Sequence, residues 1–171
     1  MDIIINGINP KNIPSNIPDT PISLPASKSI CNRVLTIVAL SDGVGDVYNV
    51  SDCDDTNAII NAITMHQKGE KYINIGAAGT AMRFMTAMLA LRTKATVTID
   101  GSARMRKRPI KELVDVLCQL GAKIEYAGES DSCPPLLIHQ APMRGGSVSI
   151  NGSISSQYIS ALMMIAPGLS D

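Results

Sequence analysis

Aromatic side chains are scarce in this sequence, which has no tryptophan, one phenylalanine and four tyrosines in 171 residues. The core must therefore be built mainly from aliphatic residues and the nine methionines. Neither sign of charge is in excess, because fifteen basic residues balance fifteen acidic ones. Net charge thus gives no reason to expect nucleic acid or a membrane as a partner, and an anion site would have to come from a local arrangement.

The sequence also lacks the usual signatures of metal binding, secretion and membrane insertion. None of its four cysteines are at C-x-x-C spacing, and its two histidines have no ligand partner nearby, which argues against a zinc site. Cys118 falls on a predicted helix and is expected to be a buried free thiol. The first residues carry no basic segment, and no apolar run approaches the roughly 18 residues that span a bilayer. We expect a soluble cytoplasmic protein with reduced thiols and no metal.

Residues 1–20 differ from the rest of the chain. Ile3, Ile4 and Ile5 predict a short strand, and the proline- and asparagine-rich stretch that follows is typical of a linker. A lone strand followed by a linker suggests pairing with something outside the main body. At the other end, Asp171 follows a helix with no further strand to cover it, so we expect the chain to be a piece of a longer protein.

From residue 21 the periodicity predicts alternating strands and helices, and hence an α+β fold with two layers. Helices are predicted over 29–41, from 54 or 55 onward with an aspartate cap, over 79–91, from Pro109 to Leu120, and over 155–166. Strands are predicted over 22–24, 46–50, 72–75, 95–99, 123–126, 136–139 and 147–150. The spacing around 21–75 is similar to that around 95–150, which predicts two related subdomains.

The first candidate functional segment is Ser27-Lys28-Ser29, which leads into a helix. Free backbone N–H groups and the helix dipole favour an anion at such a position, and serine hydroxyls and the Lys28 ammonium add donors. Arg33 is four residues beyond Ser29 and shares its helix face. A serine cap beside solvated basic residues is the alternative interpretation.

Two more helix starts have the same design. Small residues from Gly76 to Gly79 would let a ligand approach the backbone closely, and Arg83 follows one turn later. Ser155, Ser156 and Gln157 place two hydroxyls and an amide at a third helix start. A tight strand-to-helix turn explains the first segment equally well, while capping explains one serine but not the cluster.

The run from Arg104 to Arg108 contains four basic residues in five. It could bind nucleic acid, but no aromatic residues are interleaved to stack on bases. A solvated basic turn is one alternative, and a carboxylate clamp by a single arginine is another. Asp52, Asp54 and Asp55 lack a calcium-loop glycine or histidine partners, so helix capping is preferred over a metal site.

Five segments carry a more specific pattern: LPASKSICNRVLTIVAL at 24–40, SDCDDT at 51–56, GAAGTAMRF at 76–84, DGSARMRKRPIKELVDVLCQLGAKI at 100–124 and NGSISSQYISALMMIAP at 151–167. Together and in this order they resemble the enolpyruvyl transferases, in particular the branch that acts on shikimate 3-phosphate. The resemblance implies repeated βαβαββ subdomains, arranged as an inside-out α/β barrel. It implies subdomains at about 21–90 and 91–150, with a third starting at 151. Residues 1–20 would associate with a second domain that is absent here.

The resemblance also implies roles for single residues. Lys28 would be catalytic and would touch both substrates, shikimate 3-phosphate and phosphoenolpyruvate. Shikimate 3-phosphate would be bound by Lys28, Ser29, Arg33, Ser155, Ser156 and Gln157. Phosphoenolpyruvate, with which inhibitors such as glyphosate compete, would be bound by Lys28, Gly79, Arg104 and Gln157. The reaction would transfer an enolpyruvyl group to a hydroxyl and release phosphate, with no metal or cofactor.

Two positions depart from the family pattern: Ala77 replaces a usual asparagine, and Phe84 replaces a frequent proline. The acid–base residues would come from the absent C-terminal domain, so we expect this chain alone to lack useful turnover. The full-length protein is expected to be a monomer. The alternatives are the sister transferase acting on UDP-N-acetylglucosamine, which would need a reactive cysteine near Gly79–Arg108, and a nucleic-acid-binding module that uses Arg104–Arg108.

Overall fold

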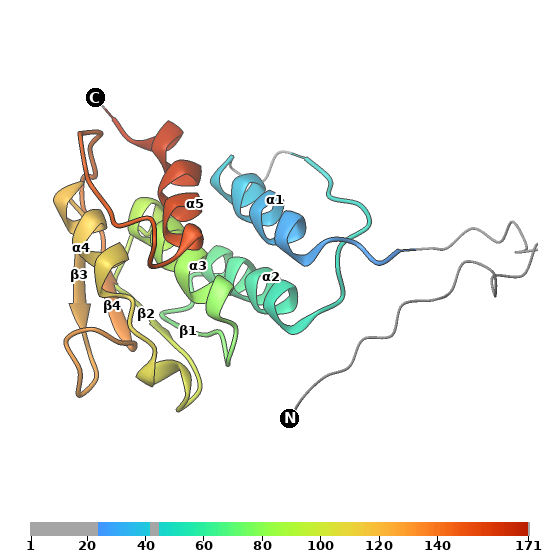
Figure 1. Cartoon of the computed structure of the whole chain (residues 1–171), viewed down its shortest axis with the longest axis horizontal. Coiled ribbons are helices and arrows are strands. Elements are labelled where there is room, and N and C mark those ends of the chain that lie inside the picture. Colours follow the sequence, from blue (N-terminus) through green and yellow to red (C-terminus); the bar gives the residue numbers. More distant parts are fainter. Residues whose placement is uncertain (1–23, 42–44, 171) are drawn as a thin grey trace, which may run out of the picture.

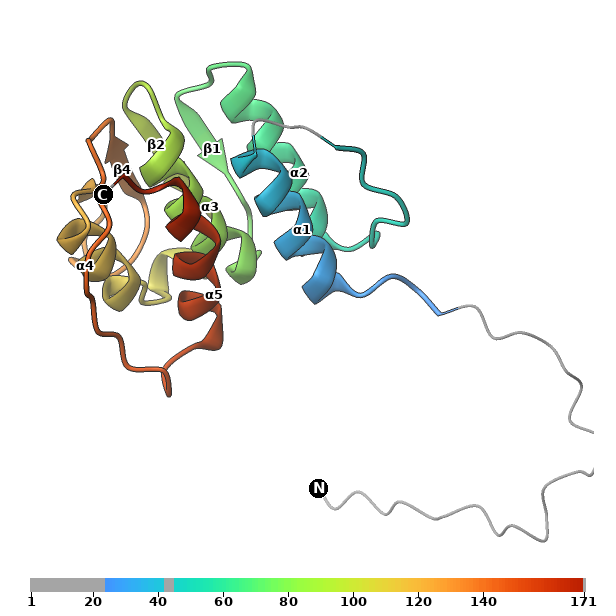
Figure 2. The ribbon, with the colours of Figure 1, turned by 90° about the horizontal axis from the view of Figure 1, so that it is seen from above.

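The computed structural model describes residues 24–41 and 45–170 of the chain. The strand and linker predicted over 1–20 lie outside this range, and Leu24, the one described residue of the strand predicted over 22–24, is not in a strand. The described residues form two layers, a mixed four-stranded sheet and a layer of helices packed beside it (Figure 1). In Figure 2 the helices α3, α4 and α5 lie on one side of the strands. The predicted α+β class is confirmed.

The elements largely follow the predicted order. They are α1 (Lys28–Leu40), α2 (Asp54–Gln67), β1 (Tyr72–Asn74), α3 (Gly79–Arg92), β2 (Val97–Asp100), the 3-10 turn η2 (Met105–Lys107), α4 (Lys111–Gln119), β3 (Lys123–Tyr126), β4 (Leu136–His139), α5 (Ser156–Ile165) and the 3-10 turn η3 (Ala166–Gly168). Helical periodicity therefore located all the helices from α1 to α5, and β-branched runs located β1 to β4.

The strands lie in the order β1-β2-β4-β3. Strands β1 and β2 are parallel, with Ile73 opposite Ile99, and the other pairs are antiparallel. The sequence β1-α3-β2-α4-β3-β4 is therefore a single βαβαββ unit. Residue 90, the predicted boundary between the first two subdomains, falls near the end of α3 within this unit, and the division of the chain at that boundary stays a prediction.

Helix α3 forms the centre of the core. It packs against α1, α2, α5 and the sheet, and most of its residues are buried, including Met82, Met85 and Met88. The methionines fill the space that aromatic residues occupy in other cores, because their flexible thioethers adapt to irregular gaps. Alternate residues of the strands, among them Ile99, supply the apolar face of the sheet.

Helix α4 lies beside α3 and contacts β3. It begins at Lys111, two residues after the predicted start at Pro109, and Gly121 ends it with a φ of +95°. Cys118 is exposed, so the prediction of a buried thiol is wrong. Its position lies off the apolar stripe that runs through Leu113 and Leu117.

Two predicted strands are absent from the described residues. Residues 46–50 form no strand, because Asn49 has a φ of +54°, in the left-handed region, and Tyr48 is 82% exposed with no strand beside it. Residues 147–150 are also irregular, although Val148 and Ile150 pack partly against the core. Strand propensity is effective only where a neighbouring strand completes the backbone hydrogen bonds, and neither segment has one here.

Candidate anion-binding site

Four helices begin around one hollow of about 480 Å³. Its lining comes from the starts of α1, α2, α3 and α5 and from the residue after η2. The lining residues are Lys28, Asp55, Ala77, Gly79, Thr80, Arg83, Arg108, Ser155, Ser156 and Gln157. Because the positive ends of helix dipoles meet here together with three cationic side chains, the hollow is suited to an anionic ligand.

The start of α1 is fixed to the starts of α2 and α3. Ser27 caps α1 by accepting a hydrogen bond from the Ile30 amide at 3.5 Å. The Lys28 ammonium lies 3.2 Å from one oxygen of Asp55, and the other oxygen accepts a 3.4 Å hydrogen bond from the Thr80 amide. Asp55 therefore holds Lys28 at the hollow, while about half of the Lys28 side chain remains open to solvent.

The starts of α3 and α5 are joined by a chain of polar contacts. Arg83 donates to the Gly79 carbonyl at 2.9 Å and to the Gln157 side-chain oxygen at 3.0 Å. The Gln157 amide nitrogen donates in turn to the Thr80 hydroxyl at 3.0 Å. Arg83 also lies over the ring of Tyr158, 5.3 Å from its centroid. These contacts orient Gln157 and Arg83 before any ligand binds.

Glycine at position 79 leaves room for two guanidinium groups. A Cβ atom there would lie 2.5 Å from the Arg108 guanidinium and 3.0 Å from that of Arg83. Any larger residue would displace one of the two cations, both of which line the hollow. Gly79, which was predicted to let a ligand approach the backbone, thus also lets two guanidinium groups approach the backbone.

The serine cluster divides into a cap and an exposed hydroxyl. Ser155 is the N-cap of α5 and accepts a hydrogen bond from the Gln157 amide at 3.3 Å. Ser156 is exposed and lines the hollow. Capping therefore uses one serine and leaves the other available to a ligand.

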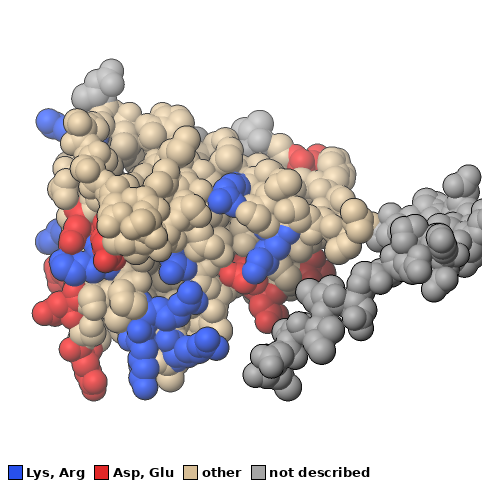
Figure 3. Space-filling view, viewed as in Figure 1, with Lys and Arg blue, Asp and Glu red and all other residues tan. Residues whose placement is uncertain are grey.

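The basic run from Arg104 to Arg108 does not act as one patch, although Figure 3 shows basic side chains gathered over the segment between β2 and α4. Arg106 is paired with the buried carboxylate of Asp100. Arg104 and Lys107 are exposed and do not line the hollow, whereas Arg108 lines it. Sequence reasoning selected Arg104 and missed Arg108. Pro109 holds Arg108 extended, with φ −103° and ψ 115°, but this local signal does not say which side chain of the run reaches the hollow.

Ser29 and Arg33 lie together on α1 but do not line the hollow. Arg33 donates to the Ser29 hydroxyl at 2.5 Å and to the Ser160 hydroxyl on α5 at 3.0 Å. It also lies 5.6 Å from the centre of the Phe84 ring. Of the predicted site residues, the structure thus gathers Lys28, Gly79, Ser155, Ser156 and Gln157, and leaves out Ser29, Arg33 and Arg104.

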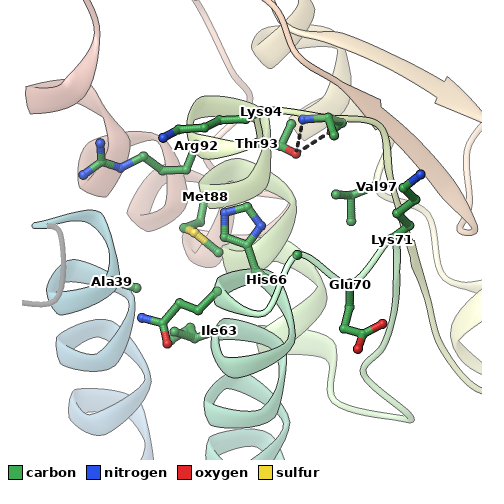
Figure 4. A pocket seen from close by; sticks show the side chains of 13 residues that line it. Ala39, Ile63, His66, Glu70, Lys71, Met88, Arg92, Thr93, Lys94 and Val97 are labelled. Atoms are coloured by element: carbon green, nitrogen blue, oxygen red, sulfur yellow. Dashed lines mark hydrogen bonds between the residues drawn. The ribbon is translucent and has the colours of Figure 1, made fainter.

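A second hollow, of about 490 Å³, lies at the other ends of α2 and α3 (Figure 4). His66 and Met88 line it, and burial lowers the pKa of His66, which favours the neutral ring. Arg92, also in its lining, donates to the Leu40 carbonyl. The negative ends of the α2 and α3 dipoles meet here, although Lys71, Arg92 and Lys94 also line the hollow, and it contains none of the predicted site residues.

The aspartates near the start of α2 are not its cap. The N-cap is Cys53, which makes no side-chain capping bond, so the predicted cap at Asp54 or Asp55 is wrong. Both carboxylates lie in the first turn instead, where the helix dipole favours negative charge. Within residues 24–41 and 45–170, no three His, Cys, Asp or Glu side chains come together as a metal site. Over the same ranges, no helix has the length and apolar character to cross a bilayer.

The fold and the hollow define a class of α+β proteins in which several helix N-termini surround one hollow suited to an anionic ligand. The family model described as EPSP synthase (3-phosphoshikimate 1-carboxyvinyltransferase) matches residues 64–171. A Bacteroides fragilis protein named 3-phosphoshikimate 1-carboxyvinyltransferase is 51% identical over 156 residues. The chain belongs to the EPSP synthase family.

Other relatives agree with this assignment. An Actinobacillus pleuropneumoniae protein of the same name is 40% identical, over 85% of this chain and 39% of its own length. The solved EPSP synthase of Acinetobacter baumannii shares the fold, with a TM-score of 0.71 and 22% identity over 84% of this chain and 37% of its own. The match to the Bacteroides protein covers 91% of this chain and 37% of that relative. The chain therefore spans well under half the length of the relatives it matches.

Proposed function

We propose that this chain contributes the N-terminal part of a 3-phosphoshikimate 1-carboxyvinyltransferase. Such an enzyme transfers the enolpyruvyl group of phosphoenolpyruvate to the 5-hydroxyl of shikimate 3-phosphate and releases phosphate. The observation that carries the proposal is the hollow in which Lys28, Arg83 and Arg108 meet the N-terminal ends of four helices. Two anionic substrates need such a concentration of positive potential, which the zero net charge of the chain does not otherwise supply.

Within this proposal, the side chains at the starts of α1 and α5 bind shikimate 3-phosphate. Ser155 and Ser156 bind the phosphate of shikimate 3-phosphate through hydroxyl and amide donors at the start of α5. Lys28 touches both substrates, and Gln157 bridges them. The role of Ser29 and Arg33 in holding the shikimate portion rests on the sequence resemblance alone, because neither residue lines the hollow.

Phosphoenolpyruvate lies against Gly79 in this proposal, and Arg108 is its cation, the role that the sequence resemblance gave to Arg104. The reason is contact: the Arg108 guanidinium lies directly over Gly79, whereas Arg104 does not line the hollow. Among the described residues no hydrogen bond or ion pair occupies the Arg108 guanidinium, so its planar fork is available to a carboxylate or phosphate.

The remaining length of the relatives supports a shared site. The acid–base residues and further cations are proposed to come from a domain that this chain does not include. The chain alone is therefore expected to bind both substrates weakly and to have no useful turnover. Near-full activity of the isolated 171-residue chain in a steady-state phosphate-release assay would contradict this.

Titration of the chain with shikimate 3-phosphate and then phosphoenolpyruvate, followed by amide NMR shifts, tests the proposed site. We expect the largest shifts at the amides of Gly79, Ser156 and Gln157. Lys28→Ala and Arg108→Ala should each weaken binding about tenfold or more, because each removes a charge-assisted contact.

Arg104→Ala is the matched control for Arg108→Ala, because it removes the same charge from the same segment without altering the lining of the hollow. It should change affinity by no more than about twofold, through weak screened electrostatics. Equal losses in the two variants would indicate a diffuse basic patch, the nucleic-acid alternative, and salt-dependent binding to random RNA would support that outcome.

The sister reaction on UDP-N-acetylglucosamine receives no support from the chain. That reading needs a reactive cysteine near Gly79–Arg108, and the sequence from 79 to 108 contains none. Cys118 lies beyond this range on α4 and is exposed, but neighbouring atoms partly desolvate its sulfur and raise the pKa of the thiol, which disfavours the reactive thiolate.

A further inference from the structure

The carboxylate of Asp100 is the most fully bonded charged group that the described residues contain. It lies at the end of β2, and the residue is 1% exposed. One oxygen accepts from the Gly101 amide at 2.7 Å and from Arg106 Nε at 3.0 Å. The other accepts from the Tyr72 hydroxyl at 2.8 Å and from a second Arg106 nitrogen at 2.5 Å.

The segment between β2 and α4 is folded around this carboxylate. The Ser102 amide donates to the Gly76 carbonyl at 2.8 Å, which ties the segment to the turn before Gly79. A Cβ atom at Gly101 would lie 2.5 Å from that same carbonyl, so only glycine allows the approach. Met105 is 2% exposed and anchors η2 in the core.

Arg108 leaves this segment two residues after Arg106. Its amide donates to the Met105 carbonyl at 2.9 Å, which closes η2. On its other side, the Pro109 carbonyl accepts a 3.0 Å hydrogen bond from the Tyr158 hydroxyl on α5. The backbone of Arg108 is thus held from both directions, while its guanidinium extends over Gly79 into the hollow.

We propose that Asp100, acting through Arg106, is a positioning residue that holds Arg108 over Gly79 for an incoming anion. This inference rests on the proposed function of the hollow. Fixing the backbone of Arg108 before binding reduces the conformational freedom that is lost when the ligand arrives, so affinity is gained without an additional contact. Arg106 itself is not available to bind the ligand, because its guanidinium is already bonded to the Asp100 carboxylate.

The pair contributes to folding as well as to positioning. The Arg106 side chain is 52% exposed, so solvent partly screens its charge, whereas the Asp100 side chain is 2% exposed and depends on its hydrogen bonds. The pair also fixes the path of the backbone between Asp100 and Arg106. It therefore sets the direction in which Arg108 leaves the segment.

The test is a double-mutant cycle on phosphoenolpyruvate binding by the 171-residue chain, measured by NMR titration. Arg106→Ala should weaken binding about fivefold, the expected cost of ordering one long side chain. In the Arg108→Ala background the same substitution should have no further effect. Lys107→Ala, the matched control with equal charge loss, should leave affinity within about twofold. Additive losses from Arg106→Ala and Arg108→Ala would overturn the proposal.

A second measurement separates this inference from the proposed function. In the unliganded chain, the backbone order parameter of Arg108 should fall below about 0.6 in Arg106→Ala, while that of Ile99 in β2 stays near 0.85. Arg106→Lys should restore part of the order, and Asp100→Asn should resemble Arg106→Ala. An unchanged Arg108 order parameter would overturn the positioning role. Failure of the unaltered chain to bind phosphoenolpyruvate would instead overturn the proposed function.

Discussion

Two regions of the molecule are held together in different ways. The βαβαββ unit, residues 72–139, packs through apolar side chains, and ten of the fourteen residues of α3 are buried. The two-helix arm, residues 24–67 as far as they are described, is covered far less. In α1 the buried residues are Cys31, Asn32 and Thr36, while Ile30 and Ile37 are exposed.

The two helices of the arm are joined to each other through polar contacts. The Thr56 hydroxyl of α2 donates to the buried side-chain oxygen of Asn32 on α1 at 2.8 Å. The ion pair from Lys28 to Asp55 adds a second link at the hollow. The difference shows that the candidate site lies where a strongly packed region meets a weakly packed one, with Lys28 on the weak side and Gly79 and Arg108 on the strong side.

The largest expected effect comes from a cavity in the strongly packed region. Ile99 is fully buried in β2, so Ile99→Ala should lower the free energy of unfolding by about 2–5 kcal/mol. Ile37→Ala in α1 is the matched control, because that side chain is 47% exposed and the change should be within about 0.5 kcal/mol. Urea denaturation of both variants measures the difference. Similar losses would remove the contrast between the regions.

Breaking the polar link should loosen the arm alone. Thr56→Val keeps the shape but leaves the Asn32 oxygen unpaired in a fully buried position, which should cost about 1–3 kcal/mol. Amide hydrogen exchange should show lost protection in α1 and α2 and unchanged protection in β2. Uniform loss of protection would show that the arm and the βαβαββ unit unfold as one.

Acid should affect the βαβαββ unit through Asp100. Burial raises the pKa of this carboxyl, but hydrogen bonds from Arg106, Gly101 and Tyr72 outweigh it and lower the pKa below its ordinary 3.8. The stabilisation is therefore present above pH 3.8 and is lost as the pH falls through the lower pKa of the folded state. One proton gives a slope of at most about 1.4 kcal/mol per pH unit.

Asp100→Asn removes that titration, so its unfolding free energy should depend less steeply on pH below about 4 than that of the unaltered chain. Denaturation series at pH 3 to 6 measure both slopes. Identical slopes would contradict the assignment of this acid sensitivity to Asp100.

The smallest effect should come from the cap of α1. The hydrogen bond from the Ile30 amide to Ser27 is 3.5 Å long and exposed, so Ser27→Ala should cost about 0.5 kcal/mol, the lower end for N-caps. Ser155→Ala at the start of α5 is the comparison, with a shorter 3.3 Å bond and a half-buried position. Thermal denaturation should rank Ser155→Ala as the more destabilising. The reverse order would show that the arm depends on its caps more than its long hydrogen bond indicates.

The local pattern of residues was sufficient for the helices and most strands. Each apolar stripe in α1 to α5 recurs at the helical period, and Gly121 ends α4 by adopting a conformation that other residues avoid. The same reasoning failed at 46–50 and 147–150. A strand exists only if another strand pairs with it, and that partner is decided by the arrangement of the whole chain.

The candidate site also contains some residues that the sequence identified and one that only the structure identified. The sequence by itself identified the helix starts at Lys28, Gly79 and Ser155, because an N-terminal cap and small residues are local signals. Which arginine of the basic run reaches the hollow was decided by the tertiary structure alone. Arg106 is withdrawn by the buried carboxylate of Asp100, and Arg108 is directed over Gly79. The physical reason is that a guanidinium pairs with the charge nearest to it in space, and spacing along the chain does not fix that distance.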